Sequence, residues 1–128
     1  MRAYTVAAAA VSLGIAPKTL DNILIRYEVA GVSRTRQGIS RRLSTRSVLT
    51  LDIALRLSRS APMPLGTALS LASIVLEHSH SSIELEKGIT LTFDLRLLAS
   101  DLDVRLAEAV EVSPAPRRGR PPARKSTK

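Results

Sequence analysis

The sequence predicts a mainly α-helical fold that ends in a β-hairpin and one further helix. Four apolar segments of helical length, separated by stretches that contain Gly or Pro, occupy most of the first 77 residues. Two short runs of alternating apolar residues, typical of strands, flank Lys87-Gly88. Hydrophobic residues make up 45% of the chain but aromatic residues only 2%, so the core that joins these elements must be aliphatic.

Charge divides the 128 residues into three parts. Residues 1–77 carry ten basic and four acidic side chains, residues 78–112 are acidic, and residues 113–128 carry six basic side chains and no acid. We therefore expect a domain over 1–77, an extension over 78–112 and a disordered basic tail over 113–128. The net charge of +8 favours a polyanionic partner, either nucleic acid or an anionic membrane surface.

Residues 4–26 are expected to form two short helices joined by a tight turn. Residues 6–13 are rich in Ala and contain neither Gly nor Pro, which favours a helix. Gly14 can end that helix with a positive φ, and Pro17 suits the first position of the next helix, residues 17–26. Small and aliphatic residues are spaced to face inward: Ala9, Ala10, Leu13, Ile15, Leu20 and Ile23. This pattern predicts a helix-turn-helix.

The outward side of the second helix supplies the candidate DNA contacts. We predict that this helix enters the major groove, with Lys18, Asn22 and Arg26 reading bases. Asn22 can pair bidentately with adenine. Asp21 is repelled by phosphate, so it is expected to accept from a cytosine amino group or to pair with Lys18 or Arg26. The candidate set also includes Pro17 and Thr19. The alternative is an ordinary corner between two helices of a small helical domain.

Residues 32–45, here called the basic loop, are rich in Arg and lack acids. The candidate phosphate contacts in it are Arg34, Arg36, Arg41 and Arg42. Gln37-Gly38 can turn a short hairpin, which would place these arginines on both arms of a wing. Arginines in such positions fix the register of a protein on the duplex without reading bases. The alternative is a solvated loop that contains Arg because the whole chain does.

These segments together resemble the winged helix-turn-helix of the MerR family. The resemblance rests on Tyr4-Thr5-Val6, Leu13-Gly14, Pro17-Lys18-Thr19-Leu20, Gly38 with Arg41-Arg42, residues 44–57 and Pro64-Leu65-Gly66-Thr67-Ala68-Leu69. It covers residues 4–77 and implies a winged-helix DNA-binding domain that acts as a transcriptional regulator, usually as a dimer. The chain departs from the family pattern at three places, which bear on the DNA sequence preferred more than on the fold: Asp21-Asn22, Leu43 and Arg46-Ser47.

Two further helices are expected in the first 77 residues. The apolar residues of 48–59 alternate like a strand, but they also fit two opposite faces of a helix. We predict a helix buried on two sides, partly from the resemblance and partly because Ser44 or Thr45 can cap it. Residues 60–64 form a break. Residues 65–77 then form an apolar helix, central to the core or to a subunit contact, with one stripe of Leu65, Leu69, Ala72 and Leu76.

Residues 82–93 predict a β-hairpin around Lys87-Gly88, with Ile83 and Leu85 on one arm and residues 89–93 on the other. A two-stranded hairpin is marginal alone, so its apolar face should pack on another element. Asp94 then caps a helix over 95–110, with a buried stripe of Leu95, Leu98, Leu102, Leu106 and Ala109. Two roles stay open for residues 81–111: a module for homodimerisation or binding of a protein partner, or a lid that closes the core.

The tail contains Arg118-Gly119-Arg120-Pro121, which resembles the core of an AT-hook. In that motif an extended Arg-Gly-Arg lies in the narrow A·T minor groove, where only Gly lets the backbone approach closely. The alternative is a generic basic tail that adds non-specific affinity for DNA.

Several functional classes are not expected. The chain has no Cys, no nucleophile–base arrangement and no Gly-rich phosphate loop, so neither an enzyme nor a cofactor-binding protein is predicted. Glu77, His78 and His80 are the only candidate metal ligands, and a polar helix end explains them better. No segment reaches the roughly 20 apolar residues of a bilayer span, so we expect a cytoplasmic, nucleoid-associated protein.

The sequence thus predicts a DNA-binding transcriptional regulator, homodimeric, with double-stranded DNA as partner and no membrane. One alternative is an architectural or recombination-directing, excisionase-like DNA-binding protein that bends DNA. Another is a protein-interaction adaptor that binds its partner through residues 81–111.

Overall fold

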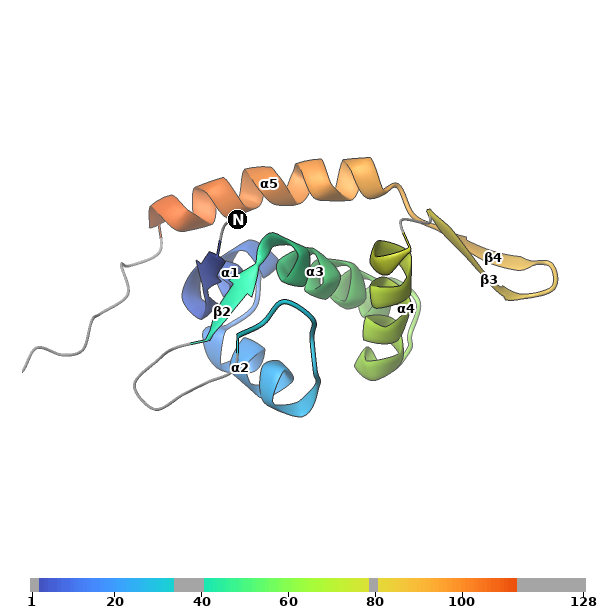
Figure 1. Cartoon of the computed structure of the whole chain (residues 1–128), viewed down its shortest axis with the longest axis horizontal. Coiled ribbons are helices and arrows are strands. Elements are labelled where there is room, and N and C mark those ends of the chain that lie inside the picture. The colour runs from blue at the N-terminus through green and yellow to red at the C-terminus, as the bar shows by residue number, and fades with distance from the viewer. Residues whose placement is uncertain (1–2, 34–40, 79–80, 113–128) are drawn as a thin grey trace, which may run out of the picture.

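A computed structural model describes residues 3–33, 41–78 and 81–112 of the chain (Figure 1). Within these ranges five helices and four short strands follow one another, and the mainly α-helical fold is confirmed. Several predicted features lie outside the described residues: Arg34, Arg36, Gln37-Gly38, His80 and the tail 113–128 with Arg118-Gly119-Arg120-Pro121.

The first two helices have the predicted bounds, α1 over Val6–Leu13 and α2 over Pro17–Arg26. The Thr5 hydroxyl accepts the Ala8 N–H at 3.1 Å and so caps the start of α1. Gly14 ends α1 with φ +74°, as predicted, and Pro17 begins α2. The two helices bend by 104° at a break of three residues. The predicted inward residues are buried, except Ile15, which is half-buried.

Strand β1 (Ala3–Thr5) pairs antiparallel with β2 (Arg42–Ser44), with Tyr4 opposite Leu43. On the other edge of β2, Val32 forms a bridge to the same Leu43. Ser33 donates its N–H to the Arg42 carbonyl at 2.9 Å, and Ser44 donates its N–H to the Gly31 carbonyl at 3.2 Å. Residues 31–33 and 41–44 therefore run antiparallel, as the two arms of a hairpin would.

The start of helix α3 (Thr45–Ser60) is fastened to the residues that precede the basic loop. The Ser47 hydroxyl donates to the Ala30 carbonyl at 2.6 Å, and the Ser44 hydroxyl caps the helix by accepting the Ser47 N–H at 3.1 Å. Gly31 passes these hydroxyls with φ +88°, and a Cβ there would collide with both. Position 31 therefore needs Gly for its conformation and for its close approach.

Helices α3 and α4 (Leu65–Glu77) pack against each other. The prediction of a helix for residues 48–59, rather than a strand, is confirmed, and of the two proposed caps Ser44 is used. The buried stripe of α4 is partly wrong, because Leu65 and Leu76 are only half-buried. The buried residues are Ala68, Leu69, Ala72 and Val75. Small residues on this side, Ala68 and Ala72, let α4 approach α3 closely.

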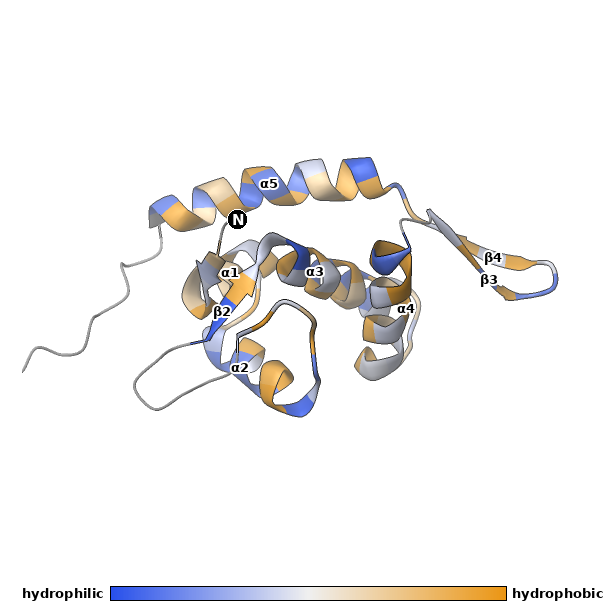
Figure 2. Ribbon diagram, in the orientation of Figure 1, coloured by the Kyte–Doolittle hydropathy of each residue, from blue (hydrophilic) through white to orange (hydrophobic). Residues whose placement is uncertain are grey.

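The extension consists of β3 (Ser82–Glu86), β4 (Ile89–Thr92) and α5 (Leu95–Val112). The Asp94 carboxylate accepts the Leu97 N–H at 3.0 Å, so it caps α5 as predicted. Leu102, Leu106 and Ala109 are fully buried, and α5 packs on α1 and α3 (Figure 1). Figure 2 shows how hydrophobic and hydrophilic residues alternate along this helix.

The hairpin projects from the end of the molecule, beyond α4 (Figure 1). Ile83 and Leu91, at its base, are half-buried against the core, but Leu85 and Ile89 are 47% and 50% exposed. The prediction that its apolar face packs on another element is therefore right at the base and wrong at the tip. The tip is exposed because the strands extend past the helices that would cover them (Figure 1).

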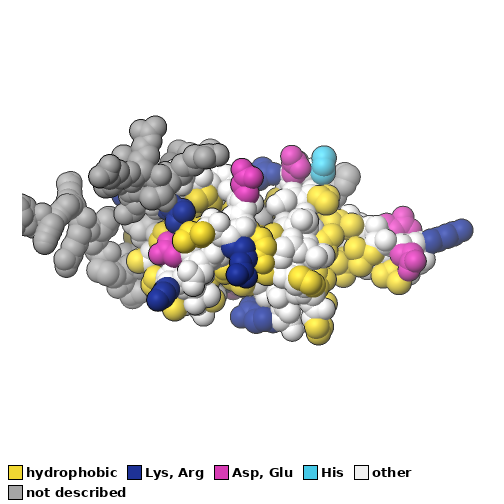
Figure 3. Space-filling view, turned by 90° about the horizontal axis from the view of Figure 1, so that it is seen from below, with side chains coloured by type: hydrophobic (Ala, Val, Ile, Leu, Met, Phe, Trp, Pro, Cys, Tyr) yellow, Lys and Arg dark blue, Asp and Glu magenta, His cyan; other side chains and the backbone are white. Residues whose placement is uncertain are grey.

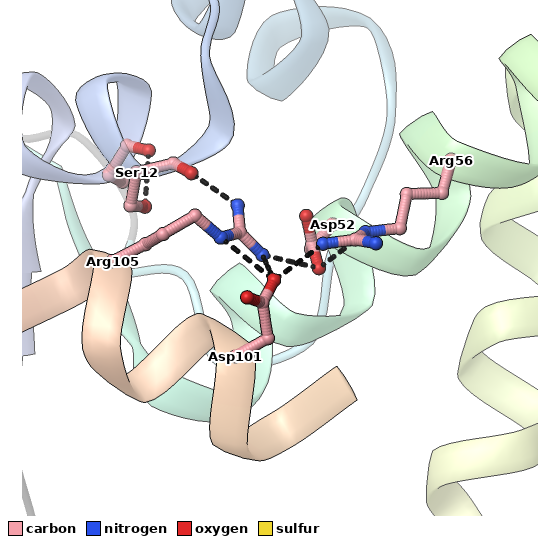
Figure 4. Close-up of polar contacts among 6 residues, drawn as sticks. Ser12, Asp52, Arg56, Asp101 and Arg105 are labelled. Carbon is pink, nitrogen blue, oxygen red and sulfur yellow. Dashed lines mark hydrogen bonds and ion pairs between the residues drawn. The ribbon is translucent and has the colours of Figure 1, made fainter. Parts of the chain in front are cut away.

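A network of charged side chains ties α5 to the first helices (Figure 4). Arg105 of α5 donates to the Ser12 carbonyl at 2.5 Å and to the Asp52 carboxylate at 3.1 Å. Arg56 donates to the same carboxylate at 3.1 Å and to Asp101 at 2.8 Å. The Asp52 side chain is only 4% exposed, so two guanidinium groups satisfy a buried charge. Nothing in the local sequence pattern predicted this link.

Candidate nucleic-acid interface

Helix α2 presents most of the predicted contact residues to solvent. Leu20, Ile23 and Leu24 are buried and hold the helix against α1, which fixes the direction of its outer side. The exposed residues of the candidate set are Pro17, Lys18, Thr19, Asn22 and Arg26. Ile25 is also outward, at 69% exposure.

Three of these exposed residues fall on one line along α2. Lys18, Asn22 and Arg26 are four positions apart, and residues at this spacing lie above one another on a helix. The line from the first to the third measures about 12 Å at a rise of 1.5 Å per residue. Two cationic side chains thus flank one amide on a single exposed stripe.

Asp21 is half-buried and joins α2 to the basic loop. Its Oδ1 lies 3.8 Å from Nη1 of Arg41. Of the two alternatives expected for Asp21, pairing with Lys18 or Arg26 is wrong, because the ion pair goes to Arg41. Acceptance of a hydrogen bond from a cytosine amino group stays a prediction. Arg26 is five positions after Asp21, and residues five positions apart are not neighbours on a helix. Lys18 is three positions before Asp21, and a basic residue that precedes its acidic partner on a helix is the less favourable order. The pair sets the second arm of the basic loop beside the outer side of α2.

Arg42 is exposed and stands opposite Thr5 in the β1–β2 ladder. Its backbone is held by Ser33, because its N–H donates to the Ser33 hydroxyl at 2.8 Å and its carbonyl accepts the Ser33 N–H at 2.9 Å. In the described part of the chain, the Arg42 side chain has no ion-pair partner. A fixed backbone with a free guanidinium can bind an anion without first breaking a contact. The contribution of Ser33 was not foreseen from the sequence.

A groove of about 710 Å³ lies between the C-terminal half of α2, the segment 27–33 and Arg41. Arg26, Arg41 and Glu28 are its charged lining residues. Arg46 is exposed in the first turn of α3. Residues 3–33 and 41–47 carry five basic and two acidic side chains, so the described part of this region attracts anions.

Figure 3 views the molecule from the side on which α2 lies in Figure 1. Lys and Arg side chains are spread over the helical body with some acidic side chains among them, and the end of the hairpin carries acidic side chains and a basic one. The extension 81–112 carries three basic and seven acidic side chains. Among the described residues, the charge that attracts a polyanion therefore lies in the first part of the chain and not in the extension.

The structure gives no support to a metal site or a membrane-spanning helix in the described residues. Glu77 and His78 approach to 3.9 Å, and no group of three metal-ligating side chains gathers among the described residues. In the same part of the chain, no single helix has both the length and the apolar content needed to cross a membrane. Helices α1 and α2 have that length and apolar content only when they are taken together, and the chain bends sharply between them.

We compared the chain with known protein families, with curated proteins and with solved structures, and no match was found in any of the three. The resemblance to the MerR family stays a prediction from the motifs in the sequence.

Proposed function

We propose that the chain is a sequence-specific DNA-binding protein that regulates transcription. Helix α2 would lie in the major groove, and the basic loop would contact the phosphates beside it. The observation that carries this proposal is the position of Arg41, within 3.8 Å of Asp21 on α2. One duplex can meet a groove-reading helix and a phosphate-binding loop together only if the two stand side by side.

The geometry of the first two helices supports the same proposal. A bend of 104° across a three-residue turn lies within the range of about 90–120° found in helix-turn-helix motifs. A second helix in that motif reads bases through its exposed side, here the line of Lys18, Asn22 and Arg26. About 12 Å of helix spans three to four base-pair steps of about 3.4 Å, which is the length that one recognition helix contacts.

The ion pair between Asp21 and Arg41 does not hinder binding. Its atoms are 3.8 Å apart and the Asp21 side chain is 48% exposed, so the pair is weak. Arg41 can turn to a phosphate and leave Asp21 to accept a hydrogen bond from a cytosine amino group. Arg34 and Arg36 would add phosphate contacts, and Arg118-Gly119-Arg120-Pro121 would lie in a neighbouring minor groove.

The experiment that tests the proposal selects bound duplexes from a random DNA pool with the full chain and measures affinity for the winner by fluorescence anisotropy at several salt concentrations. We expect an enriched sequence and an affinity that falls steeply with salt, because each neutralised phosphate contributes about 0.9 to the slope. The double variant Arg41→Ala/Arg42→Ala should bind more weakly and with a shallower slope, and Arg96→Ala, on the outside of α5, should match the parent protein.

Two results would refute the proposal: an affinity that does not respond to salt, or undiminished binding by the double variant. An architectural protein, by contrast, would bind and bend DNA without a change in transcription, which phased gel-shift measurements and a reporter assay separate.

A further inference from the structure

The β3–β4 hairpin, here called the arm, has one apolar face. Ile83 lies opposite Leu91, and Leu85 and Ile89 are a second pair of apolar residues nearer the turn. The register shift between Glu84 and Glu86 puts Ile89 opposite Glu86 and makes Leu85 the extra residue of a bulge. The first pair is half-buried at the base, whereas the second pair, at the tip, is 47% and 50% exposed. A two-stranded hairpin needs a further packing partner for stability, and the described chain supplies one only for the base.

A cavity of about 270 Å³, here called the hollow, opens at the root of the arm. Its aliphatic and aromatic lining comes from α3, β4 and α5: Ile53, Leu57, Leu91, Phe93, Leu97 and Leu98. Leu97 stands at 63% exposure, which is large for a Leu beside a cavity. The molecule thus carries an exposed apolar projection and an apolar recess on one surface.

The tip of the arm cannot fill the hollow of its own chain. Leu91 and Phe93, at the root of the arm, form part of the hollow wall. Ile89 lies two residues beyond Leu91 in β4, about 7 Å farther along the arm at about 3.3 Å per residue. Neither Leu85 nor Ile89 lines the hollow, so within the described residues both the tip of the arm and the hollow lack a packing partner.

Charge favours a second copy of this chain as that packing partner. The arm carries Glu84, Glu86 and Lys87 and is acidic by one charge. Arg56 lines the hollow but is already paired with Asp52 and Asp101, so the available basic residue at its border is Arg59, next to the lining residue Ser60. Among the described residues, Glu84, Glu86 and Arg59 have no ion-pair partner. Asp94 also lines the hollow, but its carboxylate is already engaged as the cap of α5. An acidic arm and a basic rim on the same chain complement each other between two copies.

We propose that the chain forms a two-fold dimer in which the arm of each protomer lies in the hollow of the other. A surface that carries both a projection and its matching recess closes on itself through a two-fold axis, so each contact occurs twice. Leu85 and Ile89 of one protomer pack against Leu97 and Leu57 of the other, and Glu84 and Glu86 approach Arg59. This inference goes beyond DNA binding and does not depend on it.

The test measures the molar mass of the full chain by sedimentation over a range of concentrations. We expect about twice the protomer mass of 13.8 kDa. Leu85→Glu on the arm and Leu97→Glu at the hollow should each raise the dimer dissociation constant about tenfold or more, because each places a charge against an apolar wall. Val104→Glu is the matched control, since Val104 is 57% exposed on α5 and does not line the hollow.

A mixing experiment separates the arm-to-hollow contact from other dimers. Leu85→Glu keeps an intact hollow and Leu97→Glu keeps an intact arm, so a mixture of the two can form one complete contact. With differently labelled variants, energy transfer should exceed that within either variant alone. All three residues are exposed, so thermal unfolding should stay within a degree or two of the parent protein.

Four outcomes overturn the proposal: a parent protein that stays monomeric at every concentration, an equal loss of mass with Val104→Glu, a Leu97→Glu variant that dimerises normally, and no added energy transfer in the mixture. The third of these would mean that the arms pair with each other instead.

Discussion

The helical part of the molecule (residues 3–33 and 41–78) and the extension (residues 81–112) expose their apolar residues very differently. Large exposed hydrophobic residues number three in the longer helical part, Val11, Ile25 and Ile74, and five in the shorter extension, Leu85, Ile89, Leu97, Val104 and Val110. The helical part buries most of its large hydrophobic residues in its own core, whereas the extension leaves several of them exposed to solvent. We infer that the first is complete as a scaffold and the second requires a partner.

Charge separates the same two parts. The region around α2 and β2 is basic and the extension is acidic. A polyanion would be drawn to the first and repelled from the second, so DNA and a second protomer would not compete for one surface. The two parts meet at the ionic network of Asp52, Arg56, Asp101 and Arg105.

The largest expected effect is on stability and comes from a variant that breaks this ionic network. Arg105→Ala should lower the free energy of unfolding by about 3 kcal/mol, because it leaves the buried Asp52 carboxylate with Arg56 alone and the Ser12 carbonyl without its donor. Denaturant unfolding followed by circular dichroism measures this. Arg96→Ala, an exposed Arg on the same helix without an ion pair in the described residues, should change stability by less than about 0.5 kcal/mol. Equal effects of the two variants would show that the network does not join the halves.

The next effect concerns how the helical part holds its basic loop. Gly31→Ala should destabilise the fold by about 2 kcal/mol, since it adds both a strained φ of +88° and a collision with the hydroxyls of Ser44 and Ser47. Gly88→Ala is the matched control in the arm, because its φ is +91° but a Cβ there meets nothing within 4 Å. The Gly88 variant should lose about 1 kcal/mol in the same unfolding measurement. If Gly31→Ala and Gly88→Ala lower the free energy of unfolding equally, the close approach at position 31 does not contribute to stability.

Local patterns predicted the boundaries of the helices well, because the residues that set them act on their own neighbours. Gly14 and Pro17 bracket the turn, and Ser44 and Asp94 cap the helices that follow. Contacts across the chain were not predicted. The Arg105–Asp52 pair joins residues 53 positions apart, and neither residue stands out in a periodic pattern.

In the candidate site, too, local features were predicted from the sequence and contacts between distant segments were not. The outward side of α2 was predicted because it follows from helix periodicity and from which residues are apolar. The Asp21–Arg41 contact, the backbone clamp of Ser33 on Arg42 and the double constraint on Gly31 were not, because each depends on where a separate segment returns. The exposed tip of the arm was missed for a related reason, since alternation shows that a face is apolar but not whether anything covers it.

A smaller effect tests base reading by α2 and depends on the proposed function. Asn22→Ala should reduce the preference for the selected duplex over a single-base variant by about 1.5 kcal/mol, because the amide can no longer pair with one base. Competition anisotropy with duplexes changed one position at a time would locate that base. Ser100→Ala, exposed on α5, should leave the preference as it is. A uniform loss over all duplexes would mean that Asn22 contacts the backbone of DNA rather than a base.

The smallest effect distinguishes two neighbouring arginines of the basic loop. Arg42 is exposed without an ion-pair partner in the described residues, whereas Arg41 is half-buried beside Asp21. Arg42→Ala should therefore lower the slope of log affinity against log salt by about 0.9, the share of one phosphate. Arg41→Ala should lower it by less, because part of the Arg41 charge is already balanced by Asp21. Anisotropy titrations of the two single variants at five or so salt concentrations measure both slopes. A larger slope change for Arg41 would mean that the pair with Asp21 does not reduce the contact of Arg41 with phosphate.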